Sequence, residues 1–226
     1  MSASESHHIP LEFDRLSEEE MLERADSMLL RMQGRRSVRH FDTTPVPLEV
    51  IRRCIAAAGT APSGAHKQPW TFCLVTNAEV KRAIREAAEK EEYENYHGRM
   101  SNRWLEDLKV FDTNHFKAHL EEAPAVIVVF RQVWTVSEST EGPKQQNYYV
   151  QESVGIACGM LINALHESGL VSLTHTPSPM EFLTEILKRP SNERAFLLIP
   201  VGYPAEDCTV PHLERKPLGE IMVEIH

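Results

Sequence analysis

The chain has 226 residues, of which 42% are hydrophobic and 25% charged, and its formal net charge is -9. This length and composition are typical of one globular domain with a single large core, which we expect over residues 1–226. The acidic balance argues against nucleic acid as a partner, and the sequence has no apolar run of about 18 residues that could cross a membrane.

The N-terminus and the cysteines indicate the compartment. The first residues, MSASESHHIP, lack the apolar centre of a signal peptide, so we expect a cytoplasmic protein, although a chain trimmed of an anchor would look the same. The cysteines are isolated and none has CxxC spacing, which predicts buried free thiols and no metal site. They are Cys54, Cys73, Cys158 and Cys208.

The first half of the chain predicts an arm, three helices and a strand. Residues 1–18 are polar, and we expect them to form an extended arm. A helix is predicted to begin near Ser17, because Ser17 and Glu20 have the spacing of a capping box, and to end at Gly34. A second helix is predicted in PLEVIRRCIAAAGTAPS, with Gly59 near its end, and a strand in PWTFCLVTN. The next segment, AEVKRAIREAAEKEEYENY, is predicted to be a long charged helix.

The second half predicts the rest of the sheet. The continuous apolar run APAVIVVFRQV is typical of a central strand, YYVQESVGIACGMLINALHESG of an apolar helix, and LVSLTHTP and RAFLLIPVGYP of two further strands. The small residues Gly155, Ala157, Cys158 and Gly159 fit equally a core helix or a close subunit interface. Strands separated by long helices predict an α+β or α/β fold with helices on both faces of the sheet.

Three segments outside this pattern carry separate expectations. Residues 88–120 are highly charged but contain several aromatic side chains, so we expect an active-site lid. Residues 137–147 predict a polar loop with no readable chemistry. The tail, residues 209–226, is apolar at its end, and we expect it to pack on a partner subunit.

A basic cluster, RRSVRHFD, stands out in this acidic chain. Arginine guanidinium groups beside a serine hydroxyl suit a phosphate or a polyhydroxyl chain, although the cluster taken alone fits a solvated basic turn better. Two further polar loops marked by proline, TAPSGAHKQPW and THTPSP, lie at the ends of core elements. The three loops together indicate a ligand site.

These motifs carry a resemblance to a known family. RRSVRHF, AGTAPSGAHKQPW, SVGIACGMLINALHESGL, LTHTP, LLIPVGYP and RKPL resemble the flavin-dependent nitroreductase superfamily, and within it the iodotyrosine deiodinases, over about Arg31 to Val223. The resemblance implies an α+β fold with a central mixed β-sheet flanked by helices, and an intertwined homodimer with a C-terminal extension and a helical active-site lid. It also implies flavin mononucleotide (FMN) as cofactor. The membrane anchor of vertebrate members has no counterpart here, which fits a soluble member.

The resemblance implies a set of cofactor-binding residues. The phosphate and ribityl chain would be bound by Arg35, Arg36, Ser37 and Arg39, with Arg215 reaching the phosphate region. Pro62, Ser63 and Gly64 would lie along the flavin, from the other subunit, and Gly64 would let the backbone approach the ligand closely. Thr174 and Thr176 would flank the isoalloxazine ring, and one of them, for which we favour Thr176, would donate to flavin N5. His175 is expected to face away.

The same resemblance implies the substrate-binding residues. Glu92, Tyr96 and Lys117 would bind the ammonium and carboxylate of a halotyrosine, and Ala65 would offer a backbone N–H to the phenolate oxygen. Glu92 and Tyr96 are one helical turn apart and so share a face. Without the family, a Glu and a Lys in such a charged segment would be taken as surface residues.

The predicted activity is FMN-dependent reductive dehalogenation of 3-iodotyrosine and 3,5-diiodotyrosine, with bromo- and chlorotyrosine as further candidates. The halogen-bearing carbon would be protonated before electron transfer and halide release, and the Thr174 and Thr176 hydroxyls would favour stepwise transfer. Two alternatives stay open: a general NAD(P)H-dependent nitroreductase or quinone reductase, and a flavin-bound protein that binds halotyrosine without turnover. Because no GxGxxG follows a strand, a separate reductase is the expected electron donor.

Overall fold

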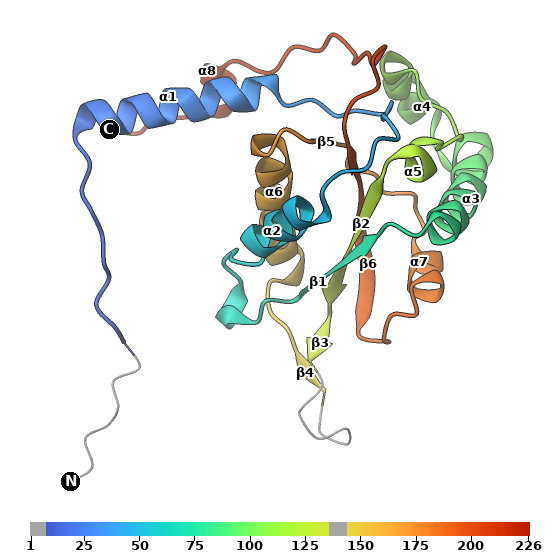
Figure 1. Ribbon diagram of the computed structural model, residues 1–226, viewed down its shortest axis with the longest axis horizontal. Coiled ribbons are helices and arrows are strands. Elements are labelled where there is room, and N and C mark those ends of the chain that lie inside the picture. Colours follow the sequence, from blue (N-terminus) through green and yellow to red (C-terminus); the bar gives the residue numbers. More distant parts are fainter. Residues whose placement is uncertain (1–7, 136–143) are drawn as a thin grey trace. The chain divides into compact units, whose positions relative to one another are not determined.

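The computed structural model describes residues 8–135 and 144–226. It divides into an N-terminal unit that ends at Arg35 and a main unit, Arg36–His226 (Figure 1). Residues 137–143 of the loop predicted at residues 137–147, and residues 1–7 of the N-terminal arm, lie outside the described residues. No helix in the described part of the chain is long and apolar enough to cross a membrane.

The N-terminal unit consists of an irregular stretch followed by helix α1 (Glu18–Gly34). The predicted capping box is present: Ser17 Oγ accepts the Glu20 N–H at 3.2 Å, and the Glu20 carboxylate accepts the Ser17 N–H at 3.0 Å. No described side chain of α1 is buried, although Leu22, Leu29 and Leu30 are apolar and more than half exposed. The helix therefore presents an apolar stripe that its own unit does not cover.

The main unit is built on a four-stranded sheet in the order β1 (Trp70–Val75), β2 (Ala125–Gln132), β6 (Glu193–Gly202), β5 (Val171–Ser172). The strand ladders are antiparallel, and a parallel bridge between Ser37 and Ser172 makes the sheet mixed. The continuous apolar run of β2 is buried on both faces between its neighbours, which confirms its prediction as a central strand.

Helices cover both faces of this sheet, as predicted (Figure 1). On one face, α2 (Leu48–Ala58) and α6 (Val150–Glu167) pack against the strand side chains that include Ile127 and Val129. On the other face, α3 (Ala78–Glu94), α5 (His119–Glu122) and α7 (Glu181–Ile186) cover the alternate side chains, including Val128. The period of two along β2 therefore divides the core into two layers.

The small residues of α6 divide between two faces of the helix. Ala157 and Cys158 are buried in the core, whereas Gly155, Ile156 and Gly159 are exposed. One face of this helix therefore packs in the core. The other face is exposed, and a subunit interface there stays a prediction.

Residues 88–120 are mostly helical. The end of α3 leads into a π-helical turn, η2 (Asn95–Arg99), then α4 (Asn102–Leu108), the short η3 (Lys109–Phe111) and α5. The strand predicted in LVSLTHTP is only two residues long, because beyond β5 the chain keeps only an isolated bridge from His175 to Leu198. The hairpin of β3 (Trp134–Thr135) and β4 (Gln145–Gln146) was not predicted. Among the described residues, η1 (Gly64–His66) and α8 (Leu218–Ile221) complete the elements.

Candidate active site

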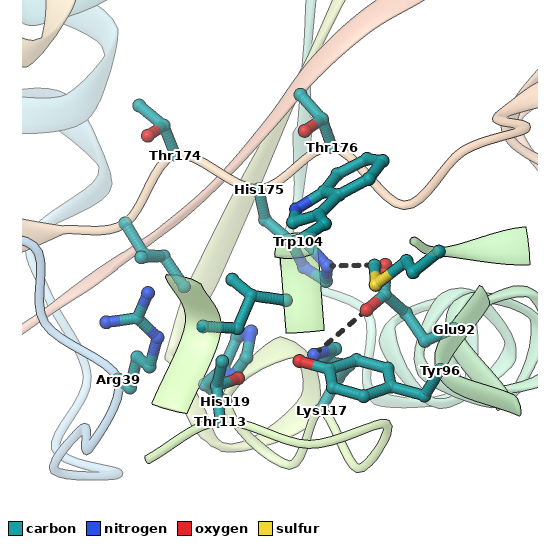
Figure 2. Close-up of a pocket in the computed structure, with 13 residues that line it drawn as sticks. Arg39, Glu92, Tyr96, Trp104, Thr113, Lys117, His119, Thr174, His175 and Thr176 are labelled. Carbon is teal, nitrogen blue, oxygen red and sulfur yellow. Dashed lines mark ion pairs between the residues drawn. The ribbon is translucent and has the colours of Figure 1, made fainter. Parts of the chain in front are cut away.

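A cavity of about 220 Å³ opens beneath the helical segment 95–111. Charged and polar side chains from four separate parts of the main unit meet in it (Figure 2). Its lining consists of Arg39, Glu92, Tyr96, Met100, Trp104, Leu108, Thr113, Lys117, His119, Leu173, Thr174, His175 and Thr176.

A buried ion pair lies at the centre of this cavity. Lys117 Nζ is 3.1 Å from Glu92 Oε2, and the two side chains are only 5% and 8% exposed. The same ammonium lies 5.4 Å from the centre of the Tyr96 ring and also donates to the Asn114 carbonyl. The three residues expected to share the substrate site are therefore in contact range, with Glu92 and Tyr96 on one face as predicted.

Burial and neighbouring charged groups shift the pKa values of both members of the ion pair. Burial opposes ionisation of Glu92, but the approach of His175 and the charge of Lys117 outweigh it, so the pKa of this carboxyl lies below its ordinary value. Burial lowers the pKa of Lys117, and Glu92 opposes that change. A carboxylate without this lysine would be a buried, unpaired charge.

Two histidines that the sequence did not indicate complete the cluster. The rings of His119 and His175 lie 5.4 Å apart between centroids at 60°, and His175 Nε2 is 3.9 Å from Glu92 Oε1. Burial, then the neighbouring His175 and Lys117, lower the pKa of His119 to about 3. Burial also lowers the pKa of His175. Both imidazoles are therefore neutral near pH 7.

The segment that carries His175 has two different faces. His175 donates its backbone N–H to Leu198 O and accepts the Leu198 N–H, both at 2.9 Å, so the segment is held on the central strand β6. The Thr174 and Thr176 side chains point to one side and His175 to the other, toward Glu92 (Figure 2). His175 was expected to face away from the ligand site; its side chain lies opposite to the threonines, but it lines the cavity beside the ion pair.

The residues of the basic cluster RRSVRHFD have different surroundings in the structure. Arg39 lines the cavity, where burial lowers its pKa, and its guanidinium lies 5.6 Å from the centre of the Phe111 ring. Arg36 donates to the Pro211 carbonyl, and Ser37 forms the bridge to β5. Arg35 belongs to the N-terminal unit. Arg36, Ser37 and Arg39 thus occupy one extended segment along the edge of the sheet.

The loop before β1 is tightly built but does not reach this cavity. Ser63 Oγ accepts the Gln68 N–H at 2.9 Å, and the Gly64 N–H donates to Ser153 Oγ at 3.3 Å. A Cβ on Gly64 would lie 2.8 Å from Tyr148 O, so close packing against the segment before α6 already requires a glycine here, and the approach of a ligand to this backbone stays a prediction. Ala65 follows with φ of 48°, a strained value for alanine.

Several residues predicted for the site do not line this cavity of the described chain: Arg35, Arg36, Ser37, Pro62, Ser63, Gly64 and Ala65. Arg215 is also absent from it and lies exposed in the C-terminal segment. Within the described part of the chain, no group of three or more His, Cys, Asp or Glu side chains could hold a metal ion.

Comparison with known proteins identifies the family. Residues 32–203 match the family model described as Nitroreductase family. The chain belongs to the nitroreductase family. It is 56% identical to the iodotyrosine deiodinase of Haliscomenobacter hydrossis, over 95% of this chain and 96% of that protein. It is 45% identical to human iodotyrosine deiodinase 1, over 96% of this chain and 75% of that protein.

A solved structure matches the fold of this chain. It is a crystal structure of oxidized iodotyrosine deiodinase bound to FMN and 3-iodo-L-tyrosine, with a TM-score of 0.73 and 29% identity, covering 88% of this chain and 98% of the other. The α+β nitroreductase fold expected from the sequence is therefore confirmed.

Proposed function

We propose that this protein is an FMN-dependent reductive dehalogenase that converts 3-iodotyrosine and 3,5-diiodotyrosine to tyrosine and iodide. The observation that carries this proposal is the buried pair of Glu92 and Lys117 beside Tyr96. An amino acid presents an ammonium and a carboxylate on one carbon, and a site that selects it needs an acid and a base placed together in an enclosed cavity. The high identity to iodotyrosine deiodinases supports the same conclusion.

The residues present fit an FMN. Thr174 and Thr176 expose their hydroxyls on the side of the segment opposite to His175, which suits hydrogen bonds to a flavin ring. Arg36, Ser37 and Arg39 offer guanidinium and hydroxyl donors for a phosphate and ribityl chain, and we assign Arg35 and Arg215 to the same phosphate region. When bound and reduced, FMN supplies the two electrons that, with one proton, replace the carbon–iodine bond by carbon–hydrogen and release iodide.

The chain's own residues bind and orient the substrate. Glu92 takes the ammonium and Lys117 the carboxylate, so each charge of the existing ion pair gains a new partner and neither is left uncompensated. The Tyr96 ring closes one side of the site. The helical segment over the cavity excludes water, which strengthens these charge interactions.

We assign the phenolate oxygen to the Ala65 backbone N–H of a second copy of the chain. Pro62, Ser63 and Gly64 do not line the cavity of their own chain, so an obligate homodimer accounts for their role along the flavin. Apolar surface supports this: the exposed α6 face at Ile156, and in the tail Leu218, Ile221 and Val223. The domain then extends over residues 1–226, with arm 1–18, lid 88–120 and a tail, 209–226, that packs on the partner.

The electron source and the compartment complete the proposal. We propose a separate reductase as the electron donor. The cytoplasm is the proposed location, because all four cysteines are free thiols, as expected for a reducing compartment.

Anaerobic reaction of the reduced protein with substrate tests this function. The FMN-loaded protein is reduced with dithionite, freed of excess reductant and mixed with 3-iodotyrosine, and tyrosine, iodide and flavin absorbance are followed. One tyrosine and one iodide per flavin reoxidised is the expected result. Tight binding without iodide release would identify a binding protein, and reoxidation by a nitroaromatic but not by iodotyrosine would identify a nitroreductase.

A further inference from the structure

We propose that His175 is a positioning residue that fixes Glu92 for the substrate ammonium and so selects substrates with an α-amino group. The inference rests on the proposed function, because it concerns the same cavity. No step of the proposed dehalogenation requires the His175 side chain, and its proposed role is in substrate binding. It also explains why an imidazole is buried beside an ion pair.

The Glu92 carboxylate lies between two different groups. Its Oε2 is 3.1 Å from Lys117 Nζ, and its Oε1 is 3.9 Å from His175 Nε2. A small rotation of either side chain brings the second pair to hydrogen-bonding distance. One oxygen then belongs to the lysine and the other is oriented by the imidazole.

The imidazole is presented from a rigid position. The two backbone hydrogen bonds between His175 and Leu198 tie it to β6, a strand paired on both sides. Glu92 itself stands at the end of α3, where the chain changes to the π-helical turn. A carboxylate at this junction needs an external group to fix its direction, and His175 is placed to supply it.

The surroundings keep His175 neutral and free to donate. Charged and titratable groups line the cavity around it from several elements: Glu92 from α3, Tyr96 from η2, Lys117 from the segment before α5, His119 from α5, and Arg39 from the segment before α2. Burial first, and then the nearby cations Lys117 and Arg39, lower the pKa of His175, so a positive charge on it is disfavoured. Neither nitrogen of His175 has a hydrogen-bond partner among the described residues, so no other protein group there competes with Glu92 for its N–H.

This arrangement has a direct consequence for substrate binding. When Lys117 turns to the substrate carboxylate, Glu92 loses part of its neutralising contact while it gains the ammonium. A neutral donor on its other oxygen compensates without bringing a charge that would repel the ammonium. The benefit exists only for a substrate that carries the ammonium.

The test compares two substrates and three variants. The FMN-loaded protein with dithionite is assayed with 3-iodotyrosine and with 2-iodophenol, which lacks the amino-acid groups. We expect H175L to lower kcat/KM for 3-iodotyrosine by about tenfold, through KM, and to change the rate with 2-iodophenol less than about twofold. H175Q, whose amide nitrogen reaches the position of Nε2, restores the loss, and the shorter H175N does not.

The Asn and Gln pair serves as the matched comparison, because both are polar and differ mainly in reach. His212→Leu, an exposed histidine in the C-terminal segment, is the control outside the cavity. Equal losses with both substrates, full activity of H175L, or equal behaviour of H175N and H175Q would each overturn the proposal. Calorimetric titration of the oxidised protein with 3-iodotyrosine separates the two hypotheses: binding that depends on His175 without iodide release refutes only the deiodinase function.

Discussion

The chain encloses two regions, the sheet core under α2 and α6 and the cavity under residues 95–111. The core is built from apolar side chains, whereas the cavity is lined partly by charged ones. The core cluster contains apolar side chains such as Leu161, Leu165 and Ile199, all fully buried. The cavity contains Glu92 and Lys117, each less than 9% exposed. Burial of charge costs stability unless it is paired, so the cavity carries a cost that the core does not. Buried charges depart from the apolar pattern of protein interiors, and such departures are typical of functional sites.

The largest effect is expected from Lys117→Ala. The change leaves the Glu92 carboxylate buried without its cation, so we expect a loss of about 3–5 kcal/mol in the free energy of unfolding. Because the substrate carboxylate also loses its partner, kcat/KM for 3-iodotyrosine should fall about a hundredfold or more. Urea unfolding and steady-state kinetics measure the two effects.

Arg99→Ala is the control for this variant. Arg99 forms an ion pair with Glu91 at 2.7 Å on the outside of the same region, where its side chain is 48% exposed. An exposed pair contributes less than about 1 kcal/mol, so stability and kinetics should hardly change. If the two variants behaved alike, the distinction between a buried and an exposed charge would be wrong here.

Leu161→Ala tests the core side of the comparison. Leu161 is fully buried in the layer between α6 and the sheet. The cavity left by the truncation should cost about 2–5 kcal/mol in the free energy of unfolding, whereas the volume-conserving Leu161→Met should cost less than about 1.5 kcal/mol. KM for 3-iodotyrosine should stay unchanged, and a raised KM would show that the core and the site are coupled.

The smallest expected effect concerns pH and His119. Its pKa is about 3 in the folded protein and near 6.5 when unfolded, so between these values the unfolded state binds more protons and stability falls as the pH is lowered. From pH 6.5 to 5 this amounts to roughly 1.5 kcal/mol. His119→Gln should remove that part of the slope in urea unfolding at the two pH values. An unchanged slope would mean that His119 is charged in the fold.

Much of the fold follows from local patterns. The helix over Glu18–Gly34 was predicted from its cap, and β2 from its apolar run, because capping and burial act within a few residues. The strand β5 was predicted to be longer than it is, although β6 continues beside it. After Ser172 the pairing reaches Pro200, which has no backbone N–H to donate, and it resumes only as the bridge between His175 and Leu198. This interruption comes from the partner strand and leaves no signal in LVSLTHTP itself.

The site was predicted unevenly. Glu92, Tyr96 and Lys117 were placed together by the family resemblance, whereas their own sequence looked like a charged surface. His119 and His175 were missed, because their contact joins α5 to a segment more than fifty residues later. One signal was available for His175: in an extended segment it must face opposite to Thr174 and Thr176, and the opposite face there is interior.

The side chains of Thr174, His175 and Thr176 alternate between two faces of one segment, and this alternation has a consequence for the energetics of ligand binding. In the proposed function one face of this segment serves the cofactor and the other the substrate, and the two backbone hydrogen bonds to β6 hold both faces in a single rigid piece. A ligand that displaces one face must displace the other, which links the two binding equilibria. Such linkage is reciprocal: whatever occupancy of the amino-acid site does to flavin affinity, the flavin does in equal measure to the affinity for the amino acid.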